Sequence, residues 1–207
     1  NFYPTKDKPI RASMMNQTDR FRYFENQTLQ ALNMFYGAGD LSMIVLLPKA
    51  RDGLAALENA LSSDLLKEVI DGLNAENSWN EVRVTFPKFK IKSSFSLKKN
   101  LTAMGMKDAF QYGPADFSGI SGNRELFICD VIHKGFIEVD EKGTEAAAAS
   151  VVIVSAACAP EQKEPIAFCV DHPFIYLIRD NRTGSILFIG RLVNPPAAGE
   201  NGNGGMK

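Results

Sequence analysis

The spacing of hydrophobic and polar side chains indicates that the first part of the chain is rich in strands. Residues 21–24 are bounded by polar residues, residues 28–36 alternate in part, and residues 41–47 form an apolar run that stops at Pro48. A short apolar run of this kind is typical of a buried strand. We therefore expect three strands before residue 48.

The phase of the alternation changes at Pro87. Between residues 82 and 86 the even-numbered positions are apolar, whereas afterwards the odd-numbered Phe89 and Ile91 are apolar. A shift of one residue turns the other face of a strand inward. The pattern predicts two strand segments joined by a bend at Pro87.

Helical spacing is confined to short stretches. Leucines at 54, 57 and 61 share one helical face, and a second apolar stripe covers residues 65–73. Candidate N-caps for this second helix are Ser62, Ser63 and Asp64, and Gly72 is a candidate for its end. A third short helix is expected at 97–104, capped by Ser96 and stopped by Gly105.

The rest of the chain adds more strands. Residues 126–139 form a long strand candidate, and residues 174–178 and 186–192 form two more. Residues 180–184, Asp-Asn-Arg-Thr-Gly, are typical of the turn of a hairpin. Strands with a cluster of helices between them predict the α+β class.

Composition excludes several classes of function. The 207 residues are 45% hydrophobic and 23% charged, with a net charge of −1, which is ordinary for a globular protein. No net field favours nucleic acid or an acidic membrane, and no apolar run approaches the ~20 residues of a membrane helix. The three cysteines, Cys129, Cys158 and Cys169, lack metal-ligand spacing. We expect no metal, no cofactor, and no nucleic-acid or membrane partner.

Residues 141–164 carry conflicting local preferences. Residues 145–149, Glu-Ala-Ala-Ala-Ala, favour a helix, whereas the β-branched run 151–154 favours a strand. A helix-to-strand junction in a core is the plain interpretation. The alternative is a functional segment, since the alanines are small enough to slip between two strands and the valine run pairs readily with a sheet edge.

Three stretches favour the second interpretation because together they resemble serpins. Residues 136–149 look like the end of a central serpin strand and its hinge, residues 168–174 resemble the family signature that follows the reactive loop, and residues 186–195 match the C-terminal strand. Weaker matches, in family order, occur at 14–15, 47–48, 86–89 and 115–119.

The resemblance implies a partial serpin fold. It covers about residues 1–195, and every matched motif belongs to the C-terminal half of a serpin domain. We therefore expect residues 196–207 to be a disordered tail, and the chain to need the N-terminal half of the domain as a partner.

The resemblance also implies a function. A serpin offers its loop, here about residues 143–165, as a substrate to a serine protease and traps the acyl-enzyme by inserting the cleaved loop into the main sheet. The alternative is a non-inhibitory serpin that acts as a binding, carrier or chaperone module. Either reading implies a protein that is not an enzyme. A thiol dyad of Cys158 with His133 or His172 is disfavoured, because neither histidine has a recognisable orienting partner.

The hinge pattern resembles that of inhibitory members. Positions 144, 146 and 148 form one face that is entirely small, and the other face has a single charge at its start. The hinge residues are Gly143, Thr144, Glu145, Ala146, Ala147, Ala148 and Ala149.

The scissile bond has two candidate positions. The family spacing counted forward from Gly143 gives the bond Ala157–Cys158, which is preferred because insertion depends on the length of the hinge side. Counting back from Pro173 gives a bond after Gln162, five residues further on (162 − 157 = 5). Small Ala157 suggests an elastase-like or subtilisin-like protease, whereas the runner-up Lys163 would suit a trypsin-like one.

Family positions assign three further residues. Lys88 and Glu141 are expected to form an ion pair where the loop enters the sheet, although two solvated charges are an equal alternative. His133 matches a histidine at the sheet opening and could also be a hydrogen-bonded core residue. His172, in the signature block, is expected to be structural.

Two further expectations concern the location of the protein and its self-association. Four Asn-x-Ser/Thr sequons, at Asn16, Asn26, Asn100 and Asn181, are compatible with secretion, with an intracellular location as the alternative. The exposed run 151–154 suggests possible loop–sheet polymers, in which one molecule adds a strand to another.

Overall fold

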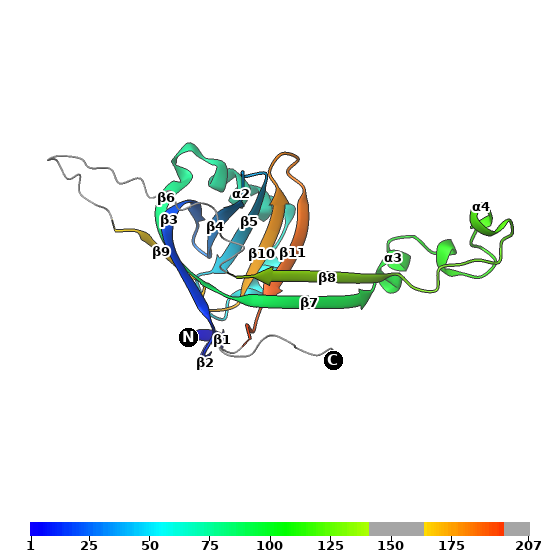
Figure 1. Ribbon diagram of the computed structural model, residues 1–207, viewed down its shortest axis with the longest axis horizontal. Helices are drawn as coiled ribbons and strands as arrows, with labels where there is room; N and C mark the ends of the chain where they lie inside the picture. Colours follow the sequence, from blue (N-terminus) through cyan, green and yellow to red (C-terminus); the bar gives the residue numbers. More distant parts are fainter. Residues whose placement is uncertain (141–163, 197–207) are drawn as a thin grey trace. The chain divides into compact units, whose positions relative to one another are not determined.

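The computed structural model describes residues 1–140 and 164–196 (Figure 1). The contacts divide the chain into two units: residues 1–89 with those from 139 onward, and residues 90–138.

A seven-stranded sheet dominates the first unit. Its order is β11-β10-β5-β4-β3-β6-β9, and all neighbouring pairs are antiparallel except β6 with β9. The strands are β3 (Met14–Glu25), β4 (Leu29–Tyr36), β5 (Leu41–Pro48), β6 (Trp79–Pro87), β9 (Ile166–Cys169), β10 (Phe174–Asp180) and β11 (Ile186–Leu192). The three strands expected before residue 48 are therefore confirmed.

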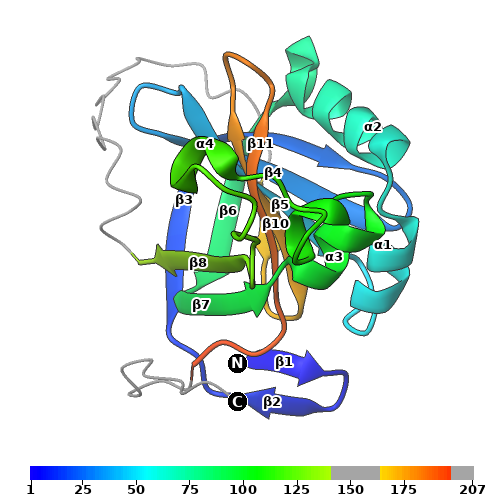
Figure 2. The ribbon, with the colours of Figure 1, turned by 90° about the vertical axis from the view of Figure 1, so that its right-hand side faces the viewer.

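Small elements complete this unit. β1 (Phe2–Thr5) and β2 (Lys8–Ile10) form a separate antiparallel pair, visible in Figure 2. Between β5 and β6 lie α1 (Leu54–Ala60), α2 (Ser63–Asn74) and a 3-10 turn at Glu76–Ser78. Strands with helices grouped between them confirm the α+β class.

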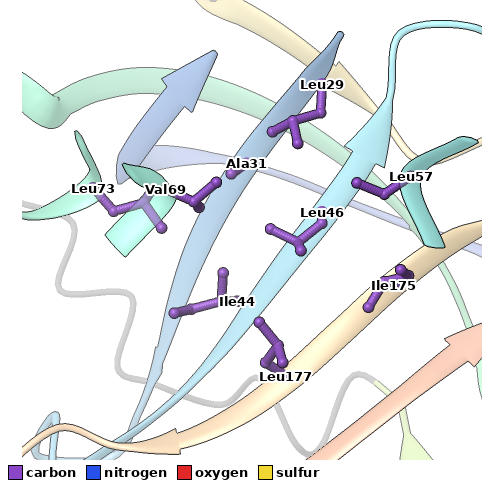
Figure 3. Close-up of a cluster of buried hydrophobic side chains, with 9 residues drawn as sticks. All are labelled: Leu29, Ala31, Ile44, Leu46, Leu57, Val69, Leu73, Ile175 and Leu177. Carbon is purple, nitrogen blue, oxygen red and sulfur yellow. The ribbon is translucent and has the colours of Figure 1, made fainter. Parts of the chain in front are cut away.

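The two helices cover β4, β5 and β10 with aliphatic side chains. Leu57 of α1 and Val69 and Leu73 of α2 lie among buried residues of these strands (Figure 3). Removal of such side chains from water drives the packing, at roughly 1.5–3 kcal/mol for each fully buried leucine or valine. The strand residues of this cluster are Leu29, Ala31, Ile44, Leu46, Ile175 and Leu177.

Helix α2 starts at the predicted cap but passes the predicted end. The Ser62 hydroxyl accepts a hydrogen bond from the Leu65 backbone N–H at 3.2 Å, and the helix continues through Gly72 to Asn74. The expectation that Gly72 ends the helix is therefore wrong. An ideal Cβ on Gly72 would lie 2.2 Å from Cδ2 of Phe24, so glycine here makes room for the Phe24 ring.

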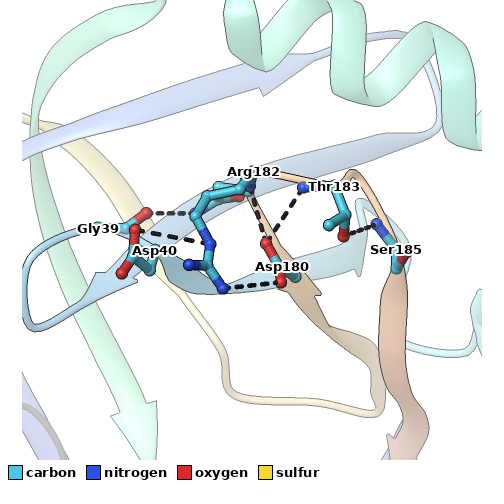
Figure 4. A network of polar contacts seen from close by, with 7 residues as sticks. Gly39, Asp40, Asp180, Arg182, Thr183 and Ser185 are labelled. Atoms are coloured by element: carbon cyan, nitrogen blue, oxygen red, sulfur yellow. Dashed lines mark hydrogen bonds and ion pairs between the residues drawn. The ribbon is translucent and has the colours of Figure 1, made fainter.

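The β10–β11 hairpin has the predicted turn (Figure 4). Oδ1 of Asp180 accepts hydrogen bonds from the backbone N–H groups of Arg182 at 2.8 Å and Thr183 at 3.2 Å. Gly184 adopts a φ of +79°, which favours glycine. These contacts satisfy the backbone of the turn, and they hold the pKa of the Asp180 carboxyl below its usual value.

The second unit contains most of a two-stranded sheet. This sheet pairs β7 (Phe89–Ser96) with β8 (Ile132–Val139), and the bend predicted at Pro87 separates β6 from β7. Between the two strands lie α3 (Lys98–Ala103), a 3-10 turn at Asp108–Phe110 and α4 (Ser118–Ser121).

The long strand expected over residues 126–139 begins only at Ile132. Just before it, the Asp130 carboxylate accepts hydrogen bonds from the Ser96 hydroxyl and, at 2.7 Å, from the Val131 backbone N–H. Ser96 also accepts from the backbone N–H of Lys98 at 3.3 Å, but the N-cap of α3 is Leu97, so the prediction that Ser96 caps this helix is wrong. The backbone N–H of Ile128 donates to the Ala109 carbonyl at 2.8 Å, so this stretch forms hydrogen bonds outside the β7–β8 pair.

Candidate functional site

Residues 141–164, whose local preferences conflict, follow strand β8 and precede strand β9 in the chain. The described chain stops at Asp140, one residue after β8, and resumes at Glu164, two residues before β9. These two strands therefore define the ends of the candidate reactive loop.

Charged and aromatic contacts fix the side chains of β8 against β7. Lys90 Nζ lies 3.1 Å from a Glu138 carboxylate oxygen and 5.3 Å from the centroid of the Phe136 ring. An added Cβ at Gly135 would meet the Ser93 hydroxyl at 2.8 Å, so the two strands approach closely there. β8 is thus a defined strand up to the point where the loop begins.

The strand after the loop is held in the large sheet. β9 pairs in parallel with β6, with Val82 opposite Ile166 and Val84 opposite Phe168. Phe168 is fully buried, and its ring meets that of Tyr23 edge-on at a centroid distance of 6.4 Å. This burial fixes the C-terminal side of the loop.

Aromatic side chains also pack around β10, the strand that follows β9. The buried Phe174 ring lies 5.4 Å from Phe86 and 6.1 Å from Phe89, measured between centroids. Phe89 also lies 5.6 Å from Tyr176. The bend at Pro87 places Phe86 and Phe89, which lie on opposite phases of the sequence pattern, in one aromatic cluster.

A polar cluster lies between β9 and β10. An Asp171 carboxylate oxygen is 3.0 Å from Arg51 Nη2, and the other is 2.7 Å from Nδ1 of His172. Nε2 of His172 lies 2.7 Å from the carbonyl oxygen of Pro48. The backbone N–H of Tyr3 donates to the Asp171 carbonyl at 2.7 Å. His172 is therefore buried and structural in its contacts.

The expected loop-entry ion pair stays a prediction. Lys88 is half-buried and its backbone N–H donates to the Ser13 carbonyl at 2.8 Å. Its expected partner, Glu141, lies outside the described residues.

His133 lies on β8 as expected but is exposed. Its ring centroid is 5.2 Å from that of Phe95 on β7. Among the described residues its ring is left exposed, and the alternative of a hydrogen-bonded core histidine stays a prediction. The expected function at the sheet opening stays a prediction.

The remaining candidate residues lie outside the described part of the chain. They are the hinge residues 143–149, the preferred bond Ala157–Cys158 and the runners-up Gln162 and Lys163, together with most of the expected tail.

Three further features of the described residues bear on function: the cysteines, the grouping of side chains that could bind a metal, and the length and polarity of the helices. Cys129 and Cys169 are free, and each residue is exposed as a whole. Partial desolvation by the surrounding atoms, followed by the nearby charge of Asp171, raises the pKa of the Cys169 thiol. In this part of the chain, no group of His, Cys, Asp and Glu could hold a metal ion. Among the described helices, none is long and apolar enough to cross a membrane.

Sequence reasoning missed the partners of Asp171. Arg51 is distant in sequence, and nothing in its neighbourhood signals a contact, although its guanidinium lies 3.8 Å from the centroid of the Tyr3 ring. The sequence signal is the adjacency of Asp171 and His172 within the signature block 168–174.

Comparison with known proteins identifies the family of this chain. A family model described as "Serpin (serine protease inhibitor)" matches residues 1–195. The chain belongs to the serpin family. The structure is also similar to the crystal structure of uncleaved ovalbumin, with a TM-score of 0.74 and 28% identity, over 94% of this chain and 47% of that one. The α+β serpin fold expected from the resemblance is thus confirmed.

Curated serpins from distant organisms are similar in sequence. An uncharacterized serpin-like protein of Thermococcus kodakarensis is 44% identical over 182 residues, which cover 88% of this chain and 41% of the relative. Leukocyte elastase inhibitor A of Mus musculus is 39% identical over 203 residues, which cover 92% of this chain and 53% of the relative. Human Serpin B10 is 39% identical over 191 residues, with 92% and 47% covered. The chain spans about half the length of these serpins.

Proposed function

We propose that this chain is the reactive-loop part of a serpin that inhibits a serine protease as a suicide substrate. The protease nucleophile attacks the loop and forms an acyl-enzyme. The cleaved hinge then adds as a strand to the main sheet and distorts the attached protease, so that deacylation stalls. Serpin loop insertion is a known example of strand addition and of stored strain.

One observation carries the proposal: a hinge of small residues follows shortly after β8, and the described residues leave one edge of β8 unpaired. β8 pairs only with β7 among the described residues, and the hinge 143–149 begins four residues after β8 ends. Inserting about 10–15 residues forms about one ladder hydrogen bond each, at roughly 0.5–1.5 kcal/mol net. The sum, of order 10 kcal/mol, is comparable to the stability of a whole domain.

The preferred scissile bond is Ala157–Cys158. A small residue on the acyl side favours an elastase-like or subtilisin-like protease, and a relative is named leukocyte elastase inhibitor. The bonds after Gln162 and Lys163 are the alternatives, the latter for a trypsin-like enzyme.

The proposal includes the N-terminal half of a serpin domain as a partner. We infer that residues 1–195 are the C-terminal part of one such domain, since the chain spans about half of its relatives. The partner would supply the strand that lies on the other side of the inserted hinge.

The test is covalent trapping. The 207-residue chain, alone and mixed with a separately produced N-terminal half of a related serpin, is incubated with elastase, subtilisin and trypsin. We expect a complex that survives SDS with elastase or subtilisin, and no complex with protease whose catalytic serine is blocked. Peptide masses after cleavage identify the bond. If both arms give cleaved loop and fully active protease, inhibition is wrong.

A second candidate is a non-inhibitory serpin that binds, carries or chaperones another molecule. Counting forward from Gly143 and back from Pro173 places the scissile bond at positions five residues apart, so the loop is longer than the family pattern. This favours the second candidate, because an overlong loop would slow insertion. Thermal unfolding before and after loop cleavage separates the two functions. A rise in the unfolding temperature supports insertion, whereas no change supports the carrier.

Two further expectations belong to this proposal. Secretion is suggested by the four sequons, and loop–sheet polymers by the run 151–154. Size-exclusion chromatography after mild heating tests the polymers: larger species support them and a single monomer peak contradicts them.

A further inference from the structure

The two faces of β8 differ in exposure. Lys134, Phe136 and Glu138 are exposed, Phe136 by 54%, whereas Gly135 and Ile137 between them are half-buried. Side chains of a strand alternate between its faces, so the three exposed side chains form a row on one face. Phe136 is the middle of this row, two residues from each charged side chain.

One edge of β8 is paired and the other is not. β7 lies along one edge (Figure 1), and from it Lys90 Nζ reaches within 3.1 Å of a Glu138 carboxylate oxygen and 5.3 Å of the centroid of the Phe136 ring. The described residues leave the other edge unpaired. Lys134 has no ion-pair partner among them, and 47% of the Glu138 side chain stays exposed. This edge therefore presents backbone N–H and C=O groups that can pair with another strand.

The order of the charges selects the strand that fits. A lysine on an edge strand ordinarily discourages pairing. In β8, however, Lys134 and Glu138 are placed symmetrically about Phe136. A second copy of β8 that runs antiparallel, with Phe136 opposite Phe136, therefore places each Lys134 opposite the Glu138 of the other copy. Opposite charges and aromatic rings directly across a ladder stabilise the pairing.

We propose that β8 is a self-recognition edge, through which two copies of this chain join their β7–β8 pairs into one four-stranded sheet centred on Phe136. The contact is isologous, so it closes at two chains and does not propagate. A shift of one residue would bring the exposed face of one copy beside the half-buried face of the other. A shift of two residues would separate the Phe136 rings and both Lys134–Glu138 pairs.

This dimer does not depend on the proposed inhibition, because it uses no residue of the reactive loop. It occupies the unpaired edge of β8, close to where the hinge begins, so pairing and insertion at this edge exclude each other. Loop–sheet polymers differ from it, since they use residues 151–154 and grow beyond two chains. Failure of trapping therefore leaves the dimer untouched, and absence of the dimer leaves trapping untouched.

Sedimentation velocity of the unheated 207-residue chain over a range of concentrations tests the contact. We expect a monomer–dimer equilibrium without larger species. Lys134→Glu places like charges at both ends of the row and should raise the dissociation constant about tenfold, and Glu138→Lys should do the same. Lys92→Glu is the matched control, because it reverses an exposed charge on β7, away from the unpaired edge, and should leave the dissociation constant unchanged.

A mixture of the two charge-reversed chains is the decisive measurement. Each variant alone opposes like charges, whereas a mixed dimer again places every acidic side chain opposite a basic one, so mixing should restore dimers. The proposal is overturned if the wild type stays monomeric up to its solubility limit or aggregates without limit. It is also overturned if Lys134→Glu dimerises as tightly as the wild type, or if the mixture stays monomeric while both variants keep the wild-type circular dichroism. If Glu138→Lys fails to fold for lack of its contact with Lys90, the wild type and Lys134→Glu still decide.

Discussion

The ring of Phe24 occupies the space that a side chain at Gly72 would fill. An ideal Cβ at position 72 would lie 2.2 Å from Cδ2 and 2.6 Å from Cε2 of Phe24. Gly72 lies inside α2, which spans Ser63–Asn74, and Phe24 comes from β3. The glycine thus allows the helix to approach this strand closely.

Gly72→Ala should therefore destabilise the protein, although alanine favours a helix by about 1 kcal/mol over glycine. The clash is with a ring that lies against the helix, and overpacking of this kind costs about 1–3 kcal/mol. Urea unfolding followed by circular dichroism measures the change in the free energy of unfolding.

The same substitution in a Phe24→Ala background is the matched control. With the ring removed, Gly72→Ala should be neutral or stabilising, because only helix propensity remains. If the alanine costs as much there as in the wild type, the contact with Phe24 does not explain Gly72.

Helix α2 also shows what local sequence can and cannot predict. Its apolar stripe and its N-cap depend on neighbouring residues, and both were found from spacing. Its end was misplaced, because the reason for Gly72 is a ring 48 positions away (72 − 24 = 48). Likewise, the strand expected from residue 126 begins only at Ile132, and just before it Asp130 contacts Ser96, 34 positions earlier in the chain.

The candidate site likewise contains local patterns, which the sequence reveals, and long-range contacts, which it does not. The signature block is a local pattern, so residues 168–174 could be recognised from the sequence, whereas the hinge at 143–149 stays a prediction. The Arg51–Asp171 ion pair and the Pro48 carbonyl at His172 are long-range contacts. Spacing carries no information about such contacts, and only the fold brings them together.

Ser62→Ala should destabilise α2. The Ser62 hydroxyl accepts a hydrogen bond from the Leu65 N–H at 3.2 Å, and loss of an N-cap of this kind costs about 1 kcal/mol. Ser63→Ala is the matched control, since Ser63 is the first helical residue and alanine is favourable there. Comparison of the two in urea unfolding checks the assignment, and an equal effect of both variants would contradict it.

Asp180 should make stability depend on pH in acid. Backbone N–H groups of Arg182 and Thr183 lower the pKa of this carboxyl from its ordinary value of 3.8. The folded state therefore binds this proton less readily than the unfolded state does. The stabilisation is present above the unfolded pKa and is lost as the pH falls through the lower folded value.

Asp180→Asn isolates this contribution. The amide oxygen can still accept from the turn, but it does not titrate. We expect unfolding temperatures measured between pH 6 and pH 2 to fall less steeply for the variant than for the wild type. Parallel curves for the two proteins would show that the turn has no part in the acid sensitivity.

Substitutions in the hinge should separate inhibition from simple cleavage. Thr144, Ala146 and Ala148 form the face that is entirely small, whereas Glu145 already places a charge on the other face. If the small face turns inward on insertion, Ala148→Arg must bury a cation and should slow insertion, so that protease is released and the loop is merely cut. Ala149→Arg, on the other face, is the matched control and should retain most of the SDS-stable complex. The ratio of complex to cleaved chain on a denaturing gel measures the outcome. If both arginines act alike, the alternation of the hinge has no bearing on trapping, whereas failure of the wild type to form any complex would count against inhibition itself.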